Sequence, residues 1–75
     1  MNDDTETAAR LAANYGEYLD TRELARVLKY SGGPSVLEQV RRGTFPIPTF
    51  KLGKKRVADV RDVAKYLDEQ RRLTA

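Results

Sequence analysis

The run Tyr-Ser-Gly-Gly-Pro-Ser at residues 30–35 constrains the fold more than any other part of the chain, because two adjacent glycines and a proline do not continue a helix. Before this run, Asp20 and Glu23 have the spacing of a capping box, and apolar residues follow at helical spacing. This pattern predicts a helix over residues 21–29. After the run, the proline suits the first position of a second helix, which we expect over residues 34–42. The sequence therefore predicts two short helices joined by a tight turn.

A different pattern follows the second helix. Residues 45–48 (Phe-Pro-Ile-Pro) cannot be helical, because each proline also moves the residue before it toward extended geometry. Residues 49–52 and 55–58 are typical of two short strands joined by a Gly-Lys turn. Two aspartates, three residues apart, then predict the cap of a final helix over residues 59–72. The expected fold class is mainly α with a small β-hairpin.

The N-terminal part of the chain differs in charge from the rest. Five carboxylates and one arginine give residues 1–20 a net charge of −4. Since the net charge of the whole chain is +3, the remaining residues carry +7. A short helix is expected over residues 5–16, capped by Thr5, but its apolar face is thin. We therefore interpret residues 1–17 as an acidic extension with a short helix, and residues 18–72 as the folded domain.

The predicted core consists of the apolar residues at helical or strand spacing in the domain. These are Leu19, Leu24, Val27, Leu28, Val36, Val40, Phe45, Leu52, Val57, Val60, Val63 and Leu67. Phe50 is left outside this set, because in a two-stranded hairpin its side chain can point outward.

Positive charge is concentrated between the second helix and the hairpin. Residues 41–56 contain six cations and no carboxylate, namely Arg41, Arg42, Lys51, Lys54, Lys55 and Arg56. Such a patch favours contact with the phosphates of a nucleic acid. The alternative for the hairpin cations is simple solvation, and the two arginines also suit the C-terminal end of a helix dipole. The glycine-rich turn is either an anion-binding helix start or only a turn.

The absence of two residue types removes most catalytic chemistry. Without Cys there is no disulfide, thiolate nucleophile or Cys-ligated zinc, and without His the usual general base and metal ligand are missing. We expect no enzymatic activity, no catalytic residue, no bound metal and no cofactor. No run of apolar residues is long enough for a membrane span, and the first residues lack the features of a signal peptide, so a cytoplasmic protein is expected.

Four segments between residues 18 and 70 carry the most specific motifs, and they read YLDTRELARVL, VRRGTFPIP, KLGKKRV and DVAKYL. Together they resemble the small MerR-like winged helix-turn-helix proteins of the excisionase and AlpA type, which belong to prophages and other mobile elements. The resemblance implies binding of double-stranded DNA by the second helix and the hairpin. It places the start of the recognition helix at Gly33, Pro34 and Ser35, with the next outward turn at Glu38. Relatives commonly have Arg, Ser or Thr, and another polar or basic residue at these positions, whereas this chain has glycine, proline and an acid, so it departs from the family there.

The resemblance also implies two roles on DNA. Members of the family act as excisionases, which direct recombination by an integrase, or as transcriptional regulators. One recognition helix reads only a few base pairs, so we expect weakly associating copies to bind cooperatively to repeated sites. The alternative is a protein-interaction module, in which the acidic N-terminal part and two phenylalanines, Phe45 and Phe50, bind an integrase or RNA polymerase.

Overall fold

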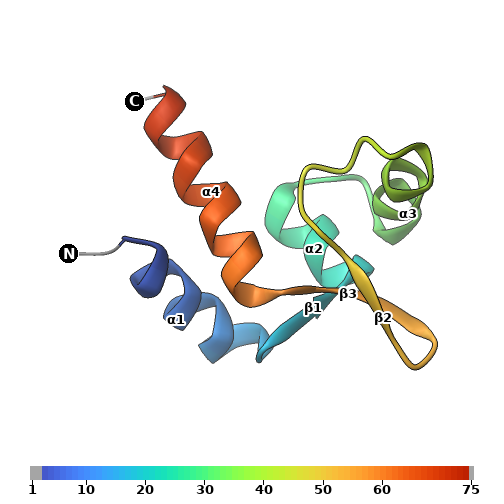
Figure 1. Ribbon diagram of the computed structural model, residues 1–75, viewed down its shortest axis with the longest axis horizontal. Helices are drawn as coiled ribbons and strands as arrows, with labels where there is room; N and C mark the ends of the chain where they lie inside the picture. The colour runs from blue at the N-terminus through green and yellow to red at the C-terminus, as the bar shows by residue number, and fades with distance from the viewer. Residues whose placement is uncertain (1–2, 75) are drawn as a thin grey trace.

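The computed structural model describes residues 3–74, with side chains from residue 6 onward, and these residues form four helices and a three-stranded antiparallel sheet (Figure 1). The elements are, in order, α1 (Asp3–Tyr15), β1 (Tyr18–Asp20), α2 (Thr21–Leu28), α3 (Gly33–Arg42), β2 (Phe50–Leu52), β3 (Lys55–Asp59) and α4 (Val60–Thr74). The expectation of a mainly helical fold with a small β-hairpin is confirmed. None of the helices in the described part of the chain is long and apolar enough to cross a membrane.

The two central helices form as the sequence predicts. The side chain of Asp20 accepts a hydrogen bond from the backbone N–H of Glu23, and the Glu23 side chain accepts one from the backbone N–H of Asp20, both at 2.9 Å. This capping box starts α2, which ends where Lys29 adopts a left-handed conformation with φ of 65°. Gly43, with φ of 74°, ends α3 in the same way. The helix α3 begins at Gly33, one residue earlier than expected.

The sheet has one strand more than the sequence predicts. β1 pairs with β3, which also pairs with β2, so that the strand order is β1-β3-β2. In this register Leu19 lies opposite Ala58, and both side chains are fully buried. The same face of the sheet carries Lys51 opposite Arg56 nearer the hairpin turn, because facing residues of paired strands project to one side.

The core lies between this face of the sheet and the helices. Its largest fully buried side chains are Leu19, Leu24, Val36 and Val63. Most of the predicted core residues are buried or pack against these four, but the prediction for Leu52 is wrong, because its side chain is 45% exposed on the outer face of the sheet. Ile47 is only 3% exposed and belongs to the core, although it is missing from the predicted core residues.

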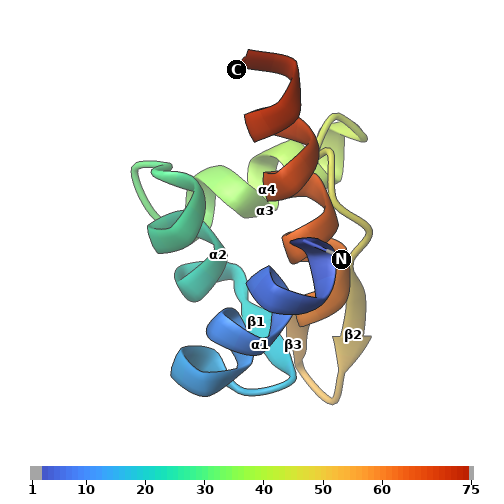
Figure 2. The same cartoon turned by 90° about the vertical axis from the view of Figure 1, so that its left-hand side faces the viewer.

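The helix α1 packs against α4, as Figure 1 and Figure 2 show from two sides. The buried Thr7 hydroxyl donates a hydrogen bond of 2.8 Å to the carboxylate of Asp68, and Leu11 and Tyr15 pack against the core. The interpretation of residues 1–17 as an extension beside the domain is therefore corrected, because α1 adds apolar side chains to the core. The helix starts at Asp3, and the side chain of its predicted cap, Thr5, lies outside the described residues.

Candidate nucleic-acid interface

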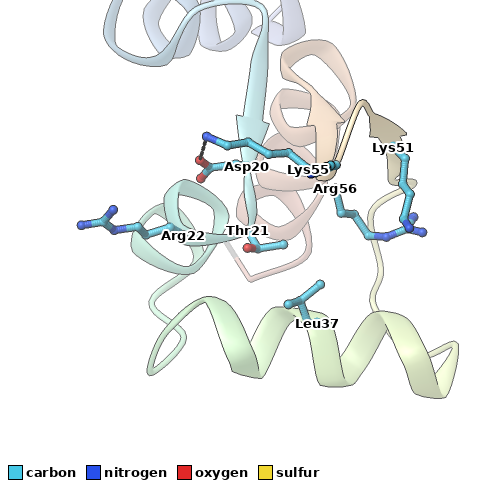
Figure 3. A pocket seen from close by; sticks show the side chains of 8 residues that line it. Asp20, Thr21, Arg22, Leu37, Lys51, Lys55 and Arg56 are labelled. Carbon is cyan, nitrogen blue, oxygen red and sulfur yellow. Dashed lines mark ion pairs between the residues drawn. The ribbon is translucent and has the colours of Figure 1, made fainter.

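The hairpin holds four exposed or partly exposed cations close together, which we call the hairpin cluster: Lys51, Lys54, Lys55 and Arg56. The turn between β2 and β3 contains Gly53 with φ of 63°, a conformation that glycine adopts readily, and it places Leu52 opposite Lys55. Lys51 and Arg56 come from different strands and project to the same side, toward α3 (Figure 3). The fold thus brings together four cations that are separated by up to five positions in the sequence.

A hollow of about 420 Å³ lies between the hairpin, α3 and the start of α2. The hairpin cluster lines it together with Asp20, Thr21, Arg22 and Leu37. Leu37 projects from α3 toward the sheet and forms an apolar part of the wall, while Arg22 points away from the hairpin on the other side (Figure 3). The hollow is therefore cationic at its rim and open to an elongated anion.

The hairpin cluster is only partly neutralised by carboxylates. Lys55 Nζ lies 3.8 Å from Asp20 Oδ2, which is a long ion pair with an exposed lysine (Figure 3). Arg56 donates a hydrogen bond of 3.0 Å to the hydroxyl of Thr49, which is a neutral acceptor. Among the described residues, no carboxylate forms an ion pair with Lys51, Lys54 or Arg56. Three positive charges of the cluster are therefore available to a ligand.

The cations at the end of α3 are arranged differently, because Glu38 pairs with both of them. Arg41 Nη1 lies 2.8 Å from Glu38 Oε1, and Arg42 Nε lies 2.9 Å from Glu38 Oε2. We call these three residues the α3 triad. The absence of carboxylates from residues 41–56 thus overstates the free charge, since Glu38 and Asp20 reach the patch from outside that segment. The signal for Glu38 is present in the sequence as spacings of three and four residues on a helix.

The first residues of α3 mainly allow α2 and α3 to pack closely against each other. A Cβ atom added to Gly33 would lie 3.2 Å from Thr21 Oγ1 and 3.6 Å from the backbone nitrogen of Arg22, so this glycine permits a close approach of the two helices. Pro34 is exposed in the first turn, and the Ser35 hydroxyl shares a hydrogen bond of 2.6 Å with that of Ser31. Of the candidates carried over from the resemblance, Pro34 and Ser35 remain accessible, and Gly33 is a packing residue.

Two residues of the site are missing from the sequence-based candidates. Arg22 adds a cation at the start of α2, and Leu37 provides the apolar wall. Arg22 was overlooked because the positive charge was counted along residues 41–56. Leu37 was overlooked because an apolar side chain carries no charge signal, although it is 40% exposed.

The arrangement suits non-covalent binding of a polyanion. In the described part of the chain no group of three or more potential ligand residues could hold a metal ion. Comparison of the chain with protein-family models gave no match, and comparisons with curated proteins and with solved structures gave no significant match. The functional argument therefore depends on the geometry and charge of the hairpin cluster and of the α3 triad.

Proposed function

We propose that the chain is a winged helix-turn-helix protein that binds double-stranded DNA and has no catalytic activity of its own. The observation that carries the proposal is the cross-strand pair of Lys51 and Arg56, which face each other without a carboxylate partner among the described residues. Like charges at directly opposite positions destabilise a sheet. A phosphate placed between them removes this repulsion, so the pair is better suited to a bound anion than to the free protein.

Two surfaces would contact the duplex in this proposal. The helix α3 is narrow enough for the major groove, and its exposed side carries Glu38, Arg41 and Arg42. The hairpin, acting as the wing, would follow the phosphate backbone with Lys51, Lys54 and Arg56. The hollow between α3 and the hairpin would lie over the sugar-phosphate chain that borders the groove.

The biological setting is proposed from the resemblance to the excisionase and AlpA type. The protein would act in the cytoplasm on DNA of a mobile element, as an excisionase, as a transcriptional regulator or in both roles. Several copies would bind cooperatively to repeated sites, with weak contacts between neighbours. The hairpin edge with Phe50, or acidic groups of α1 meeting the basic hairpin of a neighbour, would supply these contacts.

Binding of a labelled duplex of mixed sequence tests the proposal. The double variant K51Q/R56Q should lose roughly tenfold in affinity at low salt, because two cations that bind phosphates are neutralised. The matched control, K65Q/R72Q, removes the same charge from α4, which extends away from the hairpin (Figure 1), and should bind almost as the wild type does. Equal losses in the two variants would show that only net charge matters, and absence of wild-type binding would reject the proposal.

One observation favours the alternative of a protein-interaction module. Tyr18 and Phe50 make an edge-to-face contact, with ring centroids 5.7 Å apart, on the outer face of the sheet, where Leu52 is also exposed. This apolar strip fits contact with an integrase or RNA polymerase better than contact with phosphates. Phe45 does not belong to it, because Phe45 packs against the core and contacts Tyr30 edge to face at 6.0 Å. A Phe50→Ser variant that keeps full affinity for a single DNA site but loses partner binding would support this second function.

A further inference from the structure

Glu38 occupies the centre of the exposed side of α3. It comes two positions after the buried Val36 and two positions before Val40, which packs against the core. Two residues correspond to a rotation of about 200° around a helix, so Glu38 lies nearly opposite both valines. Its side chain is 43% exposed despite the two arginines beside it. A carboxylate therefore lies at the middle of the helix face opposite the core, between two arginines that are more exposed than it is.

The two arginines hold this carboxylate in a fixed position. Each carboxylate oxygen accepts a hydrogen bond from one guanidinium group, at 2.8 Å from Arg41 and 2.9 Å from Arg42. Exposed ion pairs of this kind add little to stability, so their main effect is on orientation. A carboxylate has about four acceptor positions, and these two hydrogen bonds leave others open toward a ligand. The triad as a whole keeps one positive charge, which makes a carboxylate tolerable close to DNA.

A carboxylate in the major groove discriminates between base pairs. Phosphates repel it, and so do the acceptor atoms N7 and O6 of guanine, whereas the N4 amino group of cytosine offers it a donor. Adenine also offers an amino group, but the neighbouring N7 is an acceptor that repels a carboxylate and suits the amide of glutamine. The chemistry of Glu38 therefore favours cytosine over the other three bases.

We propose that Glu38, held by Arg41 and Arg42, is the specificity-determining residue of α3 and selects a cytosine amino group in the major groove. This inference rests on the proposed function, since it assumes that α3 enters a duplex. The inference adds that α3 binds more weakly to DNA sequences that offer Glu38 no hydrogen-bond donor. The hairpin cluster contributes affinity that does not depend on the DNA sequence, and α3 docks fully only where a cytosine faces Glu38.

Selection from a pool of random-sequence duplexes tests the inference with the full chain. The wild type should enrich duplexes with cytosine at one defined position, and E38Q should change the preference at that position to adenine while the other positions stay the same. On an enriched duplex, replacing that C·G pair by A·T should weaken wild-type binding by roughly tenfold or more, and should not weaken binding of E38Q. The control E69Q makes the same charge change at an exposed residue of α4 and should enrich the wild-type sequence.

The other outcomes separate the two proposals. If E38Q enriches the same base as the wild type, Glu38 does not read the sequence and the inference is wrong. The inference is equally wrong if E38Q gains affinity for all duplexes to the same extent, because Glu38 would then act only as a repelling charge. If the wild type retains no duplex under any condition, the proposed function itself fails. Circular dichroism of E38Q should match that of the wild type, since the substituted side chain is at the surface.

Discussion

Lys51 of β2 lies directly opposite Arg56 of β3, so the hairpin carries two cations in a cross-strand pair on the side that faces α3. A cross-strand pair of like charges costs the folded state free energy, whereas a pair of opposite charges stabilises it. The hairpin is therefore less stable than the same backbone would be with a carboxylate at either position. The pair gives the site its positive charge, so stability and anion binding oppose each other at these two residues.

This opposition predicts that Lys51→Glu stabilises the protein and weakens DNA binding at the same time. The new carboxylate would face Arg56, and the free energy of unfolding should rise by about 0.2 to 1 kcal/mol. Affinity for duplex DNA should fall, because attraction to one phosphate becomes a repulsion. Thermal denaturation and duplex titration measure the two effects. Lys54→Glu changes the charge by the same amount in the turn, outside the paired strands, and should weaken binding without the gain in stability.

The contact of α1 with α4 predicts that the N-terminal helix contributes to stability. Thr7→Val removes the donor of the hydrogen bond to Asp68 while keeping the shape of the side chain, and it should lower the free energy of unfolding by about 1 to 2 kcal/mol. Thr74→Val is the matched control, because its hydroxyl is bonded at an exposed helix end and its removal should cost less than about 0.5 kcal/mol. Urea denaturation compares the two variants. Equal stabilities would contradict a contribution of the hydrogen bond between Thr7 and Asp68 to the packing of α1 on α4.

The buried Ile47 and the exposed Leu52 should respond very differently to truncation. Ile47→Ala removes a core side chain and should cost about 2 to 5 kcal/mol, whereas Leu52→Ala should cost less than about 1 kcal/mol. Denaturant titration of both variants checks the difference. Comparable losses would contradict the assignment of Leu52 to the outer face of the sheet.

Asp59 predicts a dependence of stability on acid pH. Its carboxylate accepts hydrogen bonds from the side chain and the backbone N–H of Arg61, and these contacts lower the pKa of Asp59 below its ordinary value of 3.8. A carboxyl group with a lower pKa in the folded state stabilises the protein above its unfolded pKa, and this contribution is lost as the pH falls through the folded pKa. Asp59→Asn should therefore be less stable than the wild type at pH 7, because the amide loses the charge that holds the Arg61 guanidinium, and the difference should shrink below pH 4. Denaturant titrations at neutral and acid pH measure this difference, and a constant difference would contradict the assignment.

The helices and the hairpin could be predicted because their signals are local. The capping box of Asp20 and Glu23, the glycine at position 43 and the turn at Gly53 each specify a structure within a few residues. The strand β1 could not be predicted, because it has three residues and its partner strand begins 35 positions later. Its formation depends on long-range pairing with β3, which is not encoded in the composition of residues 18–20.

The errors in the predicted core and in the predicted charge pattern have the same origin, because both depend on which segments meet in the folded chain. Leu52 was assigned to the core by its hydrophobicity, whereas the strand register places it with Phe50 on the outer face and turns Lys51 toward α3. Ile47 is buried because the folded chain passes over the core between two prolines. Charge counted along the sequence missed Asp20, which reaches Lys55 only through tertiary structure, and missed Arg22 at the rim of the hollow.

The salt dependence of duplex binding tests the central claim most directly. For a wild type that binds phosphates through the hairpin cluster, the logarithm of the association constant should fall linearly with the logarithm of salt concentration. The triple variant K51Q/K54Q/R56Q should flatten the slope by about 2 to 3, because each phosphate that a cation no longer neutralises reduces the slope by roughly 0.9. The control R10Q/K65Q/R72Q removes the same charge from α1 and α4 and should keep the wild-type slope. A slope that is the same for wild type and triple variant would contradict the account.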